Sequence, residues 1–313
     1  MEKVAQHPAE ATRVNDPASP VAGPDERVDR MAWGPLLTRA VPVVAAMVIL
    51  ATLVVAPAEE RPIILLGTLV AAAAGLASTA IGVYGGVLVP GLLLLGVDAR
   101  FAAAASLFLQ VLVIPLGAGA HYRLGNIDRH IARPLIVGGV VGAFAGPFFA
   151  TALPKDVIAR VVAALIVGVG VVVLATLRWT GLGEVRRAQD VPQAQIGGIG
   201  LVAGFSSGIS GAGWGPIGVK LLILSRLEPR LAIGSSLFGR VFMATAAVIG
   251  YLLSASAFEG VRPNYWLLVP LLAGSVAAMM PGAALVSRLG RERATIAITV
   301  LSISLALPTV ISG

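Results

Sequence analysis

The stretch Gly208–Lys220, GISGAGWGPIGVK, places five glycines and one proline inside an otherwise apolar part of the chain. Glycine weakens a helix and proline removes one of its backbone donors, so the sequence predicts a helix break here. Lys220 follows the break by only a few residues. The stretch therefore predicts two helical pieces joined by a glycine turn, with a cation close to the turn.

The surroundings of this break have the composition of a membrane protein. Of 313 residues, 57% are hydrophobic and only 12% are charged, which lies outside the usual balance of a soluble domain. Apolar runs recur along the chain, and most are long enough to cross a hydrocarbon core of about 30 Å as helices. They lie at about 40–56, 62–81, 86–97, 101–120, 131–153, 157–177, 196–224, 231–253, 265–286 and 294–311. Because lipid offers the backbone no hydrogen bonds, we expect an all-α polytopic membrane protein.

Several classes of function and site are disfavoured by what the chain lacks. It has no cysteine, which excludes disulfides, thiolate metal sites and thiol redox chemistry. The net charge of +7 is typical of basic cytoplasmic loops rather than of nucleic-acid binding. All Asp and Glu residues fall outside the expected spans, so we expect no enzyme, no metal site and no cofactor.

The sequence contains an internal repeat. Residues 82–111 align without a gap on 212–241, an offset of 130 positions, with ten identities in thirty. We therefore expect a disordered cytoplasmic tail (1–31), an extra transmembrane helix (32–57), repeat 1 (62–177), a cytoplasmic linker (178–195) and repeat 2 (196–313).

The basic residues predict that the two repeats have opposite orientations in the membrane. With the N-terminus in the cytoplasm and each broken region returning to its own side, fourteen Lys and Arg residues near the spans lie inside and five outside. This satisfies the positive-inside rule. The loop after the break then lies outside in repeat 1 and inside in repeat 2. Such inverted-topology repeats are used by many secondary transporters, and we expect a multi-pass protein of the cell (inner or plasma) membrane.

Two breaks occur at corresponding places in the repeats, at 81–86 and 211–216. The run 87–97 that follows the first break is only eleven residues long, about 16 Å as a helix, which is about half of the membrane. It either re-enters or forms half of a broken span. We expect Pro216 at the first position of the second piece, and an anion site at the free N–H groups that begin each piece. Scattered glycines such as 138, 139, 142 and 146 are expected to serve close helix packing instead.

One charged residue is predicted at the membrane midplane. Arg240 lies ten residues into the span 231–253, and its repeat partner Gln110 lies ten residues into 101–120. A guanidinium so far from either end is costly unless it is satisfied. Because no acidic residue lies within a span, its partners must be carbonyls, hydroxyls such as Ser235, or a bound anion. We therefore place Arg240 in an anion site, where its planar fork suits paired oxygens.

The remaining candidates for substrate binding surround the two breaks. Tyr84 and Trp214 are as typical of packing as of ligand contact, Lys220 either adds charge or reaches the surface, and His121 has the position of an ordinary interfacial residue. The full candidate set is Arg240, Gln110, Gly85, Gly86, Tyr84, Gly213, Trp214, Gly215, Ser106, Ser236 and Lys220.

At these residues the chain resembles the sulfite exporter TauE/SafE family, also called the toluene sulfonate uptake permease family, over about residues 62–311. The resemblance is carried by the glycine-rich segments Gly82–Pro90 and Gly211–Lys220 and by the stretch His121–Asp128. An aromatic residue interrupts both glycine turns, as in one branch of that family. The resemblance implies transport of sulfite, a sulfonate or another small sulfur-containing organic anion.

These observations predict a secondary carrier of a small anion, with alternating access around a midplane site between the broken helices. An anion channel and a carrier of small carboxylates are the alternatives, and a sensor or assembly role for the tail is a further one. The expected partners are a small anion and the lipid bilayer, without nucleic acid. The sequence leaves self-association, the coupling ion and the direction of transport open.

Overall fold

The computed structural model describes residues 35–177, 186–212, 214–254, 264–289 and 291–312. The predicted tail (1–31), most of the linker and Gly213 lie outside these residues. The chain divides into two compact units, Met1–Arg39 and Ala40–Gly313. In the first unit only Pro35–Arg39 is described, as the start of helix α2 (Pro35–Val55).

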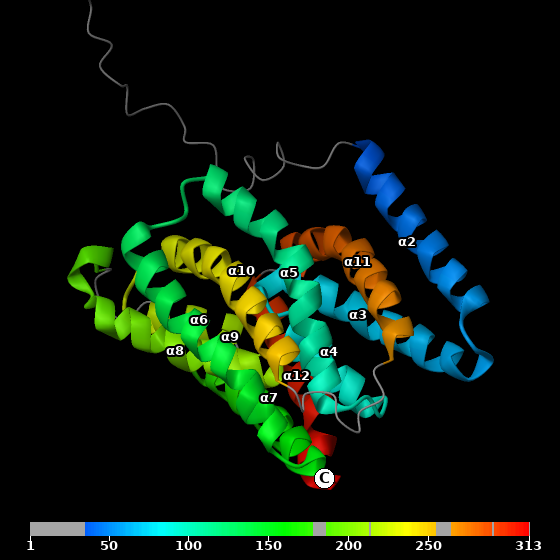
Figure 1. The fold of residues 1–313 in the computed structure, drawn as a ribbon. Coiled ribbons are helices and arrows are strands. Elements are labelled where there is room, and N and C mark those ends of the chain that lie inside the picture. Colours follow the sequence, from blue (N-terminus) through cyan, green and yellow to red (C-terminus); the bar gives the residue numbers. More distant parts are fainter. Residues whose placement is uncertain (1–34, 178–185, 213, 255–263, 290, 313) are drawn as a thin grey trace, which may run out of the picture. The chain divides into compact units, whose positions relative to one another are not determined.

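The second unit is helical, as predicted, and its helices follow the predicted apolar runs (Figure 1). Among the described residues the only β-type pairing is an isolated bridge between Arg186 and Leu227. After α2 come α3 (Arg61–Ile81), α4 (Gly85–Leu94), α5 (Ala99–Arg123), α6 (Arg129–Ala152), α7 (Lys155–Ala175), α8 (Gln193–Ser210), α9 (Trp214–Leu224), α10 (Pro229–Leu253), α11 (Leu268–Leu289) and α12 (Arg291–Ser312). Short 3-10 turns lie at Ala58–Glu60, Ala188–Asp190 and Tyr265–Leu267.

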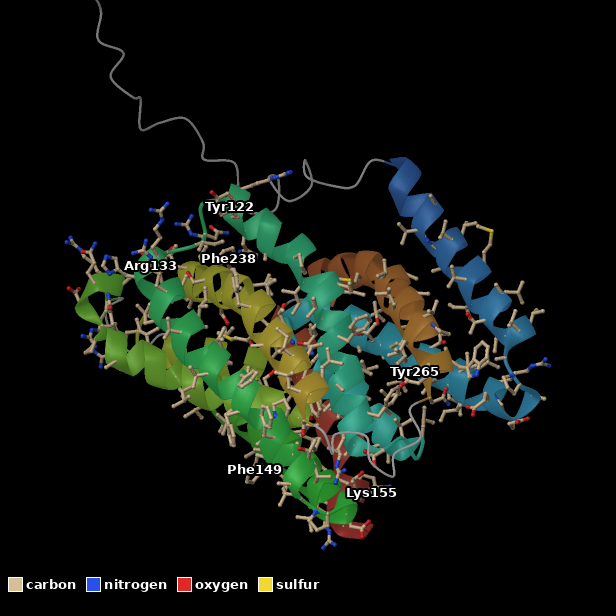
Figure 2. All side chains as sticks on the ribbon, in the orientation of Figure 1. Tyr122, Arg133, Phe149, Lys155, Phe238 and Tyr265 are labelled. Carbon is tan, nitrogen blue, oxygen red and sulfur yellow. The ribbon has the colours of Figure 1, made fainter. Side chains whose placement is uncertain are left out.

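Five helical segments in the described residues are long and apolar enough to cross a membrane. They are Ala58–Thr79, Arg129–Ala152, Lys155–Ala175, Pro229–Leu253 and Glu292–Ile311. Arg133 lies near the start of α6 and Lys155 starts α7, so these two charged residues lie at opposite ends of α6 (Figure 2). The chain is therefore an all-α polytopic membrane protein.

Both predicted breaks are present. Between α3 and α4 the chain turns at Gly82 (φ 76°), and between α8 and α9 it turns at Gly211 (φ 65°). Each glycine adopts the left-handed conformation that ends a helix, and each donates its N–H to a serine carbonyl four residues earlier, Ser78 or Ser207. One prediction about the second break is wrong: Pro216 is the third residue of α9, not the first. The first turn of a helix tolerates proline there because its N–H groups lack intrahelical acceptors in any case.

The two repeats run α3–α7 and α8–α12, and they are interleaved. Helix α6 of the first repeat packs on α8 of the second, and α11 of the second packs on α3 of the first (Figure 1). The third helices of the two repeats, α5 and α10, lie against each other, as do the fifth helices, α7 and α12. Helices from opposite repeats thus form most of the helix packing in the second unit.

Helices α5 and α10 are antiparallel. Near the end of α5, Asp128 N–H donates to Ser235 Oγ of early α10 (2.9 Å). Near the start of α5, Arg100 Nη2 donates to Leu153 O (2.7 Å), and the neighbouring Thr151 hydroxyl bonds Ser254 at the end of α10 (2.6 Å). Because these helices are repeat partners, their opposite directions give the inverted topology that the sequence predicts.

Candidate functional site

Gln110 and Arg240, the two predicted midplane residues, bind each other. Each is the twelfth residue of a 25-residue helix, so the two lie where α5 and α10 cross at mid-length. Arg240 Nε and Nη2 both donate to Gln110 Oε1, at 2.9 and 2.6 Å. The side chains are 4% and 1% exposed. The amide oxygen is therefore the polar partner that a buried guanidinium requires.

Both side chains also reach a glycine turn, and each reaches the turn of the other repeat. Arg240 Nη1, from repeat 2, donates to Gly82 O of the first turn (2.9 Å). Gln110 Nε2, from repeat 1, donates to Gly211 O of the second turn (2.9 Å). The four residues form a crossed arrangement that follows the pseudo-twofold relation of the repeats, and we call it the crossed network.

The turn carbonyls are suited to these donors. Gly82 and Gly211 end α3 and α8, where unpaired carbonyls and the negative end of the helix dipole gather. The guanidinium of Arg240 at Gly82 O and the amide N–H of Gln110 at Gly211 O give each of these carbonyls a donor. The three bonds of Arg240 use three of its five N–H groups, so its fork retains capacity for another acceptor.

Ser106 and Gly85 complete the contact between the two turns. Ser106 Oγ donates to Gly211 O (2.9 Å) and accepts from Gln110 Nε2 (3.0 Å). A Cβ on Gly85 would lie 1.9 Å from Gly211 O and 2.8 Å from Ser106 Oγ. Only glycine at position 85 therefore allows the start of α4 to approach the second turn so closely.

Five other predicted site residues lie on α9, on α10 or just before α4. Tyr84 is buried and its hydroxyl bonds Ser275 Oγ of α11 (2.7 Å). Ser236, the repeat partner of Ser106, is buried on α10, and Lys220 is half-buried on α9. Trp214 and Gly215 form the first turn of α9. Ser235, named above as a partner for Arg240, bonds Asp128 instead.

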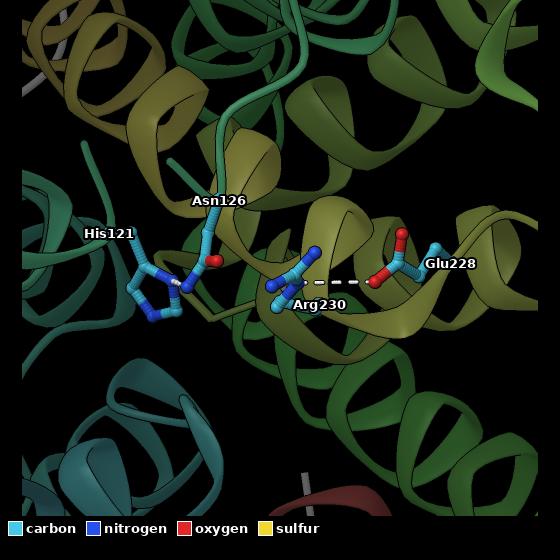
Figure 3. Close-up of polar contacts among 4 residues, drawn as sticks. All are labelled: His121, Asn126, Glu228 and Arg230. Carbon is cyan, nitrogen blue, oxygen red and sulfur yellow. Dashed lines mark hydrogen bonds and ion pairs between the residues drawn. The ribbon is translucent and has the colours of Figure 1, made fainter. Parts of the chain in front are cut away.

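His121, at the end of α5, is outside the network. Its Nδ1 lies 3.2 Å from Asn126 Nδ2, at the end of the second unit where Arg230 pairs with Glu228 (Figure 3). This is the helix-end placement that the sequence favours for His121.

A pocket adjoins both turns on the side of α7 and α12. Its empty volume is about 390 Å³ when the open solvent at its mouth is included. Its walls include Val83 and Gly86 of the first break, Ser210 and Ala212 of the second, and residues of both fifth helices. Gly86 is the predicted site residue that the structure places in this wall. Neither Arg240 nor Tyr84 is among the described residues that line it.

The hydroxyl residues of this pocket were missed by sequence reasoning. Ser210 ends α8, and Thr299 and Ser302 lie one helical turn apart on α12. A signal for the last two was present, since hydroxyl residues at 295, 299 and 302 recur at helical spacing within an apolar run.

Comparisons with known proteins agree with this architecture. The family model for the sulfite exporter TauE/SafE matches residues 66–308. The probable membrane transporter protein YtnM of Bacillus subtilis (strain 168) is 29% identical over 206 residues, which cover 63% of this chain and 65% of that protein. The probable membrane transporter protein YdhB of the same organism is 29% identical over 171 residues, 53% of this chain and 66% of that protein.

The chain thus spans just under two thirds of the length of each of these relatives. No solved structure matches it. Because the family match includes both repeats, both glycine turns and the crossed network, the chain belongs to the sulfite exporter TauE/SafE family.

Proposed function

We propose that this protein is a secondary carrier of a small anion, which it binds at the two glycine turns and moves by alternating access. The observation that carries the proposal is the crossed network. It joins the two repeats at their helix breaks through a single buried cation, Arg240. A cation at that depth without a carboxylate partner among the described residues creates a positive potential where an anion would otherwise meet only lipid-like surroundings.

The substrate class follows from the site and from the family. The site offers the positive potential of a guanidinium and the first-turn N–H groups of α4, and both favour an oxyanion. The name of the family supports sulfite, and a sulfonate or another sulfur-containing organic anion has the same oxygen chemistry. A small carboxylate is the runner-up because its oxygens match the same donors.

Carrier action is favoured over a channel by the burial of the turns. Eight consecutive residues of α4, Gly85–Leu92, are buried, so the broken helix is enclosed by protein rather than lining an open pore. A channel would need a continuous polar path.

Counterflow in proteoliposomes tests this proposal. Vesicles loaded with unlabelled sulfite, methanesulfonate or acetate are diluted into a trace of the labelled anion. A carrier accumulates label transiently, whereas a channel gives no overshoot and supports large currents. The expected result is overshoot with at least one anion. Flux equal to that of protein-free vesicles for every anion would refute the proposal.

A matched pair of glycine variants ties the flux to the turns. Gly85→Ala places a methyl group against Gly211 O, whereas a Cβ on Gly198 in α8 meets nothing within 4 Å. Counterflow is expected to fall strongly in Gly85→Ala and to persist in Gly198→Ala. Equal flux in both variants would show that the contact between the turns is not needed.

The protein is proposed to lie in the cell (inner or plasma) membrane with its N-terminus in the cytoplasm, on the strength of the basic residues near the spans. Ser19→Cys in the tail, in a chain without other cysteines, provides the test. We expect an impermeant thiol reagent to label Ser19→Cys only after the cells are opened. Labelling of intact cells would show that the N-terminus lies outside.

A further inference from the structure

We infer that the pocket between the glycine turns and helices α7 and α12 is the binding site for an organic anion with a sulfonate or carboxylate head and a short apolar tail. The inference rests on the proposed carrier function and narrows it. It places the substrate beside the crossed network and not on Arg240, and it makes Thr299 the first contact for the head.

The location of the pocket suits a carrier. Its walls come from both repeats, with the two breaks on one side and the repeat-related helices α7 and α12 on the other. A ligand in this space therefore touches the elements that must move against each other during alternating access.

The donors in the pocket gather at one part of its wall. Tyr84 O accepts from the N–H groups of Val87 and Leu88, which leaves the amides of Gly85 and Gly86 at the start of α4 without intrahelical acceptors. Gly86 lines the pocket, and a Cβ built on it would lie 3.7 Å from Ser302 Oγ. The positive end of α4 and the hydroxyl of Ser302 thus face the same space.

Thr299 offers a second, independent contact for a ligand. Its side chain lines the pocket, the residue is 6% exposed, and none of the hydrogen bonds of the described residues involves its hydroxyl. Because this oxygen is not among the buried polar atoms without a partner in the described residues, it is accessible from the pocket. Ser302, one turn further along α12, donates to Ile298 O (2.9 Å) and keeps lone pairs and a rotatable proton. An oxyanion head would satisfy Thr299.

The rest of the pocket wall favours a ligand with an apolar tail. Helix α7 contributes mainly aliphatic side chains, among them Leu165, Val169 and Val173. No charged side chain is among the described residues that line the pocket. A bare oxyanion such as sulfite would lose water on its apolar side without any compensating contact, whereas an alkyl group there gains by burial. Arg240 bonds the carbonyl of Gly82, and the next residue, Val83, lines the pocket. The positive charge of Arg240 is therefore close enough to favour an anion in the pocket.

The pocket favours a small ligand. Its empty volume of about 390 Å³ includes open solvent at the mouth, so the enclosed part is smaller than this figure. A head with a short tail therefore suits the pocket better than a large aromatic sulfonate does.

The test uses thermal stabilisation of the purified full chain in detergent, with sulfite and sulfate against methane-, ethane-, propane- and butanesulfonate and the matching carboxylates. A ligand that binds the folded protein raises its midpoint by mass action. Affinity is expected to increase about three- to fourfold for each added methylene until the pocket is full. Comparison of the two series identifies the head.

Five variants test where the ligand binds. Thr299→Val is expected to weaken every member of the preferred series by roughly tenfold, and Ser302→Ala offers a second probe of the head. Thr245→Val, which alters an exposed hydroxyl on α10, is the control and should bind as the wild type does. Val169→Ala should shift the optimum to a longer tail, and Val169→Phe to a shorter one.

The outcomes separate this inference from the proposed function. If the wild type shows anion counterflow but binds sulfite as tightly as the alkyl anions, or if Thr299→Val and both Val169 variants bind as the wild type does, the pocket is not the site and the carrier proposal stands. If the wild type gives no counterflow with any anion, the carrier proposal fails, and the inference that rests on it fails as well.

Discussion

Arg240 shows how a membrane protein keeps a cation at depth without a carboxylate. Burial of a charge is expensive, and the usual remedy is an ion pair. Here the guanidinium donates two hydrogen bonds to the Gln110 amide oxygen and one to Gly82 O. Both acceptors are neutral, but Gly82 O stands at the negative end of the 21-residue helix α3. The helix end thus supplies part of the negative potential that an Asp or Glu supplies elsewhere.

Removal of this cation is predicted to destabilise the protein strongly. Arg240→Met deletes three hydrogen bonds and leaves Gln110 Oε1 and Gly82 O buried without their donor. The free energy of unfolding is expected to fall by about 3–5 kcal/mol, measured as unfolding midpoints in detergent. Arg230→Met removes an exposed pair with Glu228 and should cost less than about 1 kcal/mol.

An exchange variant separates the loss of charge from the loss of position. Because the network follows the pseudo-twofold relation, Gln110→Arg combined with Arg240→Gln keeps one guanidinium and one amide at the crossing. At least half of the lost stability should return. A double variant no more stable than Arg240→Met would contradict the symmetric description of the network.

At the scale of helices, two seams of small residues hold the repeats together. Along α6, added Cβ atoms at Gly138, Gly142 and Gly146 would collide with the backbone of α8, and along α8 the same is true of Gly204 and Gly208 against α6. In the equivalent pair, a Cβ on Gly75 of α3 would lie 2.2 Å from Ser275 O of α11. The packing role predicted for the scattered glycines is confirmed, since only a missing side chain lets backbones approach this closely.

The α6–α8 seam should be sensitive to one added side chain. Gly142→Leu would place its Cβ 2.2 Å from Leu201 O, so α6 must move away from α8. We expect overpacking to lower the free energy of unfolding by about 1–3 kcal/mol. The measurement is the half-life of the monodisperse protein in detergent at raised temperature.

Gly168→Leu on α7 is the control for this prediction, because a Cβ at Gly168 meets nothing within 4 Å. Because leucine has a higher helix propensity than glycine, this change stabilises a helix by up to about 0.8 kcal/mol. The half-life of the variant should therefore be at least that of the wild type. Equal half-lives of the two variants would mean that α6 and α8 can move apart without loss of stability.

At the scale of the whole second unit, repeat partners at the two ends of the α5–α10 pair differ in exposure. Ala99 and Arg100 at the start of α5 are 4% and 6% exposed, whereas Pro229 and Arg230 at the start of α10 are exposed. Likewise Tyr251 is buried and bonds Ile209 O, while its partner His121 is half-buried beside Asn126 (Figure 3). Among the described residues, the start of α5 is therefore more enclosed than the start of α10.

Alternating access would exchange these exposures, and cysteine labelling can follow it in a chain without native cysteine. In permeabilised membranes a hydrophilic thiol reagent should label Pro229→Cys roughly tenfold faster than Ala99→Cys, a ratio that corresponds to about 1.4 kcal/mol. A saturating transported anion should accelerate labelling of Ala99→Cys. Tyr122→Cys, at a 70% exposed position, sets the upper rate. Equal rates without anion would show that neither end is sealed.

Sequence reasoning reached most of the fold and part of the site. Helix positions, both breaks and the mid-helix positions of Gln110 and Arg240 were predicted, because each depends on the local order of apolar and breaking residues. That Gln110 and Arg240 bind each other was not predicted, nor was the role of Gly82 O. The pocket hydroxyls Thr299 and Ser302 also escaped notice, because their helical spacing with Thr295 indicates a shared helix face but not what that face contacts.

The sequence by itself determined that the chain spans a membrane as helices, that two of these helices are broken, and that the two halves repeat. The lipid environment is the physical reason, because hydrocarbon forms no hydrogen bonds with backbone groups and makes each unpaired charge costly. Only the tertiary structure decided that α6 pairs with α8 and α3 with α11, and that Arg240 reaches a turn 158 residues away. Such contacts depend on how closely glycine seams let backbones approach, and helix periodicity gives the buried face but not its partner.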